Sequence, residues 1–199
     1  ACATRQKTES RESAPNIVII YADDMGYGDL ACQNPNSKIP TPNLDQLASE
    51  GMRFTDAHSP AALCAPSRFS LLTGSYPYRS DRPGGAWNIS SPSIFTDNRG
   101  TTRAGHHVTV AQILQQAGYR TAFFGKSHLG GDVRDSTGAL IRKQREISRM
   151  DFSRGLENSV DAFGFDYSYV LPSGIQHEPF AFFENGRYAP IDPSAPPDN

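Results

Sequence analysis

Short apolar runs alternate with capped helical stretches along this chain, and the pattern predicts strands that alternate with helices. Residues 16–22 are a continuous β-branched run, which is typical of a strand buried on both faces. The stretch from Thr41 to Gly51 predicts a helix, because Thr41 fits the N-cap, a proline follows in the first turn and Gly51 fits the stop. A short strand is expected over residues 52–57.

The second half of the chain has the same order of elements. Residues 109–117 predict a helix that ends before Gly118. Its buried side is expected to carry Ile113 and Leu114. Residues 119–124 predict the next strand. Because strand–helix–strand units alternate and polar residues follow the strands, the predicted fold class is α/β with a doubly wound sheet.

Other stretches are interpreted from their composition. Residues 81–107 are poor in apolar side chains and are expected to be a long surface excursion near the mouth of a site. Residues 141–150 are basic and are expected to be a solvated helix face. Residues 180–188 predict a hairpin with an Asn-Gly turn. Residues 190–199 predict a linker, and residues 1–14 a flexible tail.

Composition excludes several classes of function. The chain has 199 residues, with 19 Lys and Arg against 21 Asp and Glu, so nothing indicates a nucleic-acid groove or an anionic membrane surface. No run of about 18 apolar residues occurs, so no transmembrane helix is predicted. If Cys64 takes part in a reaction, Cys2 and Cys32 are the two cysteines left, and they allow at most one disulfide. Cys2 also suits a lipoprotein cleavage site.

The densest local motif is Cys64-Ala-Pro-Ser-Arg68. Residues i and i+4 of a helix share a face, so Arg68 is expected beside Cys64. A proline in the first turn costs little, and Cys64 is expected at the positive end of the helix, where an anion can meet a nucleophile. A lone cysteine is more often a small buried residue, but these neighbours favour a chemical role.

Polar motifs follow two of the predicted strands. Asp23-Asp24 ends the first strand, and paired carboxylates suit Ca²⁺ or Mg²⁺, although Asp also caps turns. Lys126 and His128 follow the strand over residues 119–124 in the sequence Gly-Lys-Ser-His-Leu-Gly. In isolation, these two would be an ordinary surface lysine and loop histidine.

The three motifs, in this order, resemble the type I sulfatases, which are formylglycine-dependent, arylsulfatase-like enzymes of the alkaline phosphatase superfamily. The resemblance implies an alkaline-phosphatase-like, doubly wound mixed sheet flanked by helices. It matches only the amino-terminal half of a typical member. Residues 15–189 are therefore expected to be the first part of a truncated catalytic domain, with a second metal-binding pair, a later lysine and a later histidine beyond Asn199.

The resemblance also implies the chemistry at Cys64. A formylglycine-generating or anaerobic maturation enzyme would oxidise its thiol to an aldehyde, which is then hydrated. One hydroxyl attacks the sulfur of a sulfate ester, and the second lets the covalent sulfate leave. Asp23, Asp24 and the modified Cys64 would bind Ca²⁺ or Mg²⁺.

Three basic residues would assist this reaction. Arg68 would hold the diol with its planar, always-charged guanidinium. Lys126 and His128 would contact sulfate oxygens. Two departures from the family pattern stand nearby: Ser127 replaces a usual tryptophan, and Gly174 replaces a serine that follows the lysine–histidine motif.

The substrate implied is a sulfated carbohydrate or an aryl sulfate, and His177 is expected to contact its sugar or aryl group. The resemblance implies a periplasmic or extracellular enzyme. Two alternatives stay open: a phosphonate monoester or phosphodiester hydrolase of the same superfamily, and a non-catalytic glycan-binding relative whose Cys64 stays a thiol.

Overall fold

The computed structural model describes residues 14–80, 87, 89–94 and 107–190. Most of the predicted tail over residues 1–14 and linker over residues 190–199 lies outside the described residues, as does Cys2. The chain divides into two compact units, residues 1–53 and 54–199, which are described separately.

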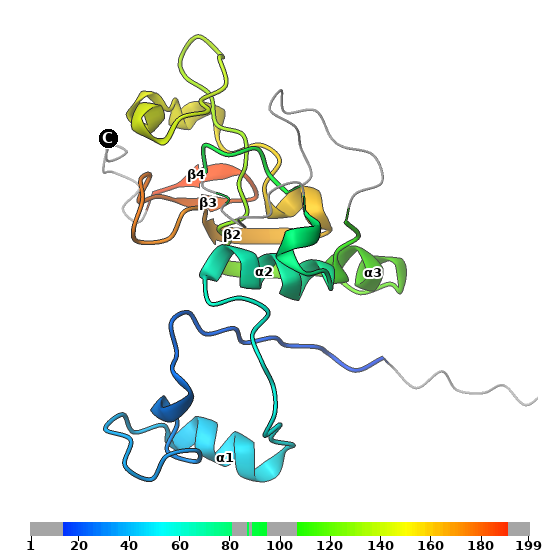
Figure 1. The fold of residues 1–199 in the computed structure, drawn as a ribbon. Coiled ribbons are helices and arrows are strands. Elements are labelled where there is room, and N and C mark those ends of the chain that lie inside the picture. Colours follow the sequence, from blue (N-terminus) through cyan, green and yellow to red (C-terminus); the bar gives the residue numbers. More distant parts are fainter. Residues whose placement is uncertain (1–13, 81–86, 88, 95–106, 191–199) are drawn as a thin grey trace, which may run out of the picture. The chain divides into compact units, whose positions relative to one another are not determined.

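The first unit contains the helix that the sequence predicted. Helix α1 spans Pro42–Glu50, with Thr41 at the N-cap position and Gly51 at the C-cap (Figure 1). The Thr41 hydroxyl does not cap the helix backbone. It donates to the Asp45 carboxylate and accepts the backbone N–H of Ala31, so it joins α1 to the loop before it.

The strands predicted over residues 16–22 and 52–57 are absent, so both predictions were wrong. The first segment is exposed, with Val18 at 82% and Ile20 at 79% of their accessible area. A strand exists only where a neighbouring backbone completes its hydrogen bonds, and the described residues of this unit include no other strand. A run of β-branched residues has a high propensity for strand structure, but it does not provide the neighbouring strand.

The second unit contains a mixed sheet in the order β1-β2-β3-β4. Its strands are β1 (Ala122–Lys126), β2 (Tyr167–Leu171), β3 (Phe182–Glu184) and β4 (Arg187–Ala189). Strands β1 and β2 are parallel, and the remaining pairs are antiparallel. The sheet confirms the mixed α/β class. The hairpin is confirmed too, with Asn185 and Gly186 at φ of 48° and 77° in its turn.

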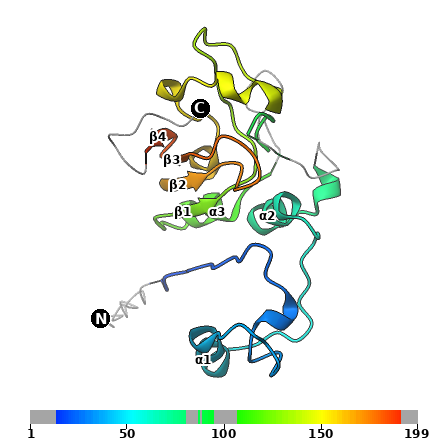
Figure 2. The same ribbon diagram turned by 90° about the vertical axis from the view of Figure 1, so that its left-hand side faces the viewer.

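Two helices lie on the β1 side of this sheet in both ribbon views (Figures 1 and 2). Helix α2 spans Cys64–Thr73, and α3 spans Val110–Gln116. Helix α3 begins with a capping box between Thr109 and Gln112. Its expected buried face was wrong at Ile113, which is 56% exposed, because this two-turn helix buries Ala111 instead. None of the helices in the described part of the chain has the length and hydrophobicity to span a bilayer.

The basic stretch over residues 141–150 is not a solvated helix face. It contains the 3₁₀ helix Gln144–Arg149, and Ile141 and Met150 are buried. Arg142 forms an ion pair with Asp132, whose side chain is fully buried. A buried carboxylate needs a cation and hydrogen bonds, so this arginine turns inward.

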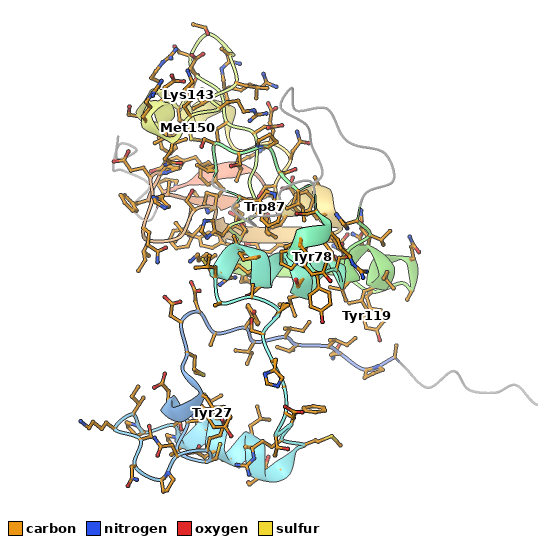
Figure 3. The ribbon with its side chains drawn as sticks, in the orientation of Figure 1. Tyr27, Tyr78, Trp87, Tyr119, Lys143 and Met150 are labelled. Atoms are coloured by element: carbon orange, nitrogen blue, oxygen red, sulfur yellow. The ribbon has the colours of Figure 1, made fainter. Side chains whose placement is uncertain are left out.

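The expected surface excursion was wrong at residues 87 and 89–94, which are mostly buried. Its other residues up to 106 lie outside the described part of the chain. Trp87 stacks on Phe69 of α2 with ring centroids 5.1 Å apart, close to α2 in Figure 3. Ile94 donates its N–H to the carbonyl of Leu129. This segment therefore forms part of the core between α2 and the chain that leaves β1.

Asp166 generates a prediction about acid stability. Hydrogen bonds lower the pKa of this carboxyl from its ordinary 3.8. The largest effect comes from the Thr121 backbone N–H, and smaller ones come from the Thr121 hydroxyl and the Gln115 side chain. A pKa that is lower in the folded state stabilises the fold above pH 3.8, and this contribution is lost as the pH falls through the folded value. Asp166→Asn should therefore lower the Tm at neutral pH, and the difference should shrink near pH 3. A Tm difference that is the same at both pH values would contradict this assignment.

Candidate active site

Helix α2 places Cys64 and Arg68 on one face. Cys64 is the first residue of the helix and is half-buried, and Arg68 is only 9% exposed. Pro66 lies in the first turn, where the absence of its N–H costs no helical hydrogen bond. The predicted side-by-side placement follows from the i, i+4 spacing.

Strand β1 places Lys126 and His128 at its carboxyl end. The parallel pairing with β2 continues past the strand, because Ser127 donates its N–H to the carbonyl of Leu171 and His128 donates to that of Pro172. His128 has a φ of 52°, so the chain turns sharply at this residue. The turn holds a buried histidine side chain at the edge of the sheet.

The two elements meet through these four residues. Cys64 Sγ lies 3.2 Å from His128 Nδ1. Arg68 Nη1 donates a hydrogen bond of 2.6 Å to the backbone carbonyl of Lys126. The structure therefore brings together residues that are 64 and 58 positions apart in the sequence.

The motif serine, Ser67, braces the loop that precedes the helix. Its hydroxyl donates to the carbonyl of Ala61 at 2.8 Å and lies 2.9 Å from the Ser59 hydroxyl. Ser59 also donates to Ala61. Ser67 thus fixes the turn that leads into Cys64, which gives it a structural task that sequence reasoning missed.

Sequence reasoning did not predict the surroundings of Ser127, Ser173 and Gly174. The hydroxyls of Ser127 and Ser173 are buried and have no hydrogen-bond partner among the described residues. Gly174 lies directly against the Lys126 side chain. The only sequence signal was that Ser127 and Gly174 depart from the family pattern, which does not reveal a contact.

The expected substrate residue His177 is exposed, three residues beyond Gly174. No described contact tests its role, so it stays a prediction.

The predicted metal ligands Asp23 and Asp24 belong to the first unit. Both are exposed, and Asp24 has a φ of 57° in a bend that follows the apolar run. Their hard oxygen atoms fit Ca²⁺ or Mg²⁺. Among the described residues, no three His, Cys, Asp or Glu side chains gather as a metal site. The metal site also stays a prediction.

The second-unit site is suited to a tetrahedral anion. The amino-terminal end of α2 carries a positive partial charge, and Arg68 and Lys126 add two cationic side chains. The Cys64 side chain lies where this positive potential meets the His128 ring. Such an arrangement can hold an anion against a nucleophile and a proton-carrying group.

Comparison with known protein families gives a match over residues 15–176 to the model described as Sulfatase. An N-acetylgalactosamine-6-O-sulfatase of Bacteroides thetaiotaomicron is 38% identical over 96% of this chain, which covers 33% of that protein. Human arylsulfatase A is 48% identical over 116 residues, which are 58% of this chain and 21% of that protein. The chain thus spans a third or less of these curated relatives.

A solved structure from a study of glycosaminoglycan metabolism by Bacteroides thetaiotaomicron has a similar fold. It superposes with a TM-score of 0.69 at 35% identity, over 93% of this chain and 34% of that chain. The described sheet and helices therefore have the alkaline-phosphatase-like arrangement of that sulfatase structure.

The Ser67 brace generates a stability prediction. Ser67→Ala should lower the free energy of unfolding by about 1 kcal/mol, because it removes one buried hydrogen-bond donor while Ser59 still satisfies the acceptor. Ser70→Ala is the matched control on the same helix, since the Ser70 hydroxyl is buried without a described partner. Urea unfolding measures both variants. Equal losses from the two would show that the brace contributes nothing.

Proposed function

Because this chain belongs to the sulfatase family, we propose that the protein hydrolyses a sulfate ester, with Cys64 matured to formylglycine at the centre of the site. The observation that carries the proposal is the contact of Cys64 with His128 at the start of α2, beside the link between Arg68 and Lys126. The chain spans only part of its relatives, so the proposal concerns the whole protein.

Cys64 is suited to maturation because it is half-buried at a helix start and not enclosed in the core. A formylglycine-generating or anaerobic maturation enzyme supplies the oxidant that converts its thiol to an aldehyde. The hydrated aldehyde supplies a nucleophilic hydroxyl for attack on sulfur.

The basic residues of this chain orient and stabilise the reacting group. Lys126 and the end of α2 bind sulfate oxygens and stabilise the negative charge that develops on them. Arg68 holds the strand that carries Lys126 and adds its own positive charge. His128 Nδ1 lies 3.2 Å from Cys64 Sγ, so its ring is placed to exchange a proton with the side chain of residue 64.

Asp23 and Asp24 would hold a Ca²⁺ or Mg²⁺ ion, with further oxygen ligands completing the six to eight that Ca²⁺ takes. The ion would supply positive charge that favours proton loss from the nucleophile.

We propose a sulfated carbohydrate as the substrate class. The support is the similarity over 96% of this chain to a relative named as an N-acetylgalactosamine-6-O-sulfatase. We also propose a periplasmic or extracellular location, with Cys2 as the candidate lipid anchor.

The central test combines mass spectrometry with an ester panel on the full-length protein from its native source. The tryptic peptide Phe54–Arg68 should be lighter by the thiol-to-aldehyde change. The protein should prefer sulfate esters over phosphodiesters, phosphonate monoesters and phosphate monoesters. Cys64→Ala should lower kcat/KM by at least about 10³-fold, because it removes the nucleophile.

His58→Gln is the control for this set, since His58 is exposed and pairs only with Asp56 in the described contacts. An unmodified thiol in natively matured protein that binds sulfated sugars without turnover would identify a binding relative. A preference for phosphodiesters or phosphonates would overturn the sulfatase assignment.

His177 generates a separate prediction about substrate binding. His177→Ala should raise KM for a sulfated oligosaccharide by about tenfold, which corresponds to the loss of one hydrogen bond. It should leave the kinetics on a small aryl sulfate unchanged. Identical kinetics on both substrates for variant and wild type would remove His177 from the substrate site.

A further inference from the structure

The Lys126 side chain lies across the backbone of Gly174. A Cβ atom at position 174 would stand 2.6 Å from Lys126 Cε, 2.9 Å from Cδ and 3.1 Å from Nζ. Ordinary contacts of a Cβ atom begin near 3.4 Å. The space that any other residue would need is therefore filled by the lysine.

The backbone of Lys126 is held from two sides. Lys126 pairs with Leu171 in the parallel register, and the next two N–H groups of the β1 chain donate to the carbonyls of Leu171 and Pro172. Arg68 holds the carbonyl of Lys126 from the opposite element. Gly174 follows two residues after Pro172, whose carbonyl accepts the N–H of His128.

The atoms that would have to shift lie at the far end of the lysine side chain. The three atoms that a Cβ would meet are Cδ, Cε and Nζ, which turn about flexible single bonds. A side chain at position 174 would thus displace the Lys126 amine while the fold stays intact.

We propose that Gly174 is a positioning residue for Lys126: its missing side chain leaves the path along which the lysine amine reaches the anion site. The inference rests on the proposed sulfatase function, in which that amine binds a sulfate oxygen. It concerns this chain's own backbone at position 174, where an added Cβ atom would meet the Lys126 side chain.

The test uses the full-length, matured protein with Gly174→Ala and Gly174→Ser. Gly118→Ala is the matched control, because Gly118 has a φ of 88° against 77° for Gly174 but has no atom within 4 Å of an added Cβ. Both positions have a φ in the left-handed region that disfavours a side chain, and of the two only position 174 has atoms in the way of an added Cβ.

Both Gly174 variants should lower kcat/KM for a sulfate ester by about 10²-fold, as expected for a binding group displaced by about 1 Å. Their Tm should match that of Gly118→Ala, and Gly118→Ala should keep wild-type kinetics. In a Lys126→Ala background, Gly174→Ala should change kcat/KM by less than about twofold, because the two changes remove the same interaction. A purely structural role would give additive losses and a lower Tm.

Three outcomes would overturn the inference: wild-type kinetics for Gly174→Ala, additive losses in the double variant, or a Gly174→Ser variant more active than Gly174→Ala. If the wild-type protein hydrolyses no sulfate ester, the proposed function fails, and crystal structures of wild type and Gly174→Ala decide the inference alone. Lys126 Nζ should then differ in position by more than about 1 Å, and an unmoved amine would refute it.

Discussion

The hydrogen bond from the Arg68 guanidinium to the Lys126 carbonyl is the interaction on which the site depends. It joins the helix that begins at Cys64 to the strand that ends at Lys126, across 58 positions of sequence. A guanidinium that is 9% exposed loses most of its hydration, so it must be directed at a fixed acceptor. That requirement sets the distance between α2 and β1, and the contact between Cys64 and His128 follows from it.

A second constraint is the parallel pairing of β1 with β2, which continues one step beyond each strand. The loop that follows β1 contains Ser127 and His128. Its backbone pairs with that of Leu171 and Pro172 on one side. Gly174 follows this paired segment and lies against the Lys126 side chain.

Local features were predictable from the sequence because they depend on a few neighbouring residues. The bounds of α1, the turn at Asn185-Gly186 and the shared face of Cys64 and Arg68 all follow from short-range rules. The strand predicted over residues 16–22 was wrong because a strand forms only when a second strand completes its backbone hydrogen bonds. The burial of Trp87 and the inward turn of Arg142 were missed because each depends on a partner, Phe69 or Asp132, that lies outside its own local segment. The metal site and the role of His177 stay predictions.

The exposed run from Ile17 to Ile20 also affects how this polypeptide behaves in solution. Residues 16–21 combine high β-propensity with no charge and no proline, which is the composition of segments that stack into cross-β assemblies. Their backbone has no sheet partner within the described part of the first unit. We therefore expect these 199 residues alone to self-associate through this segment as their concentration rises.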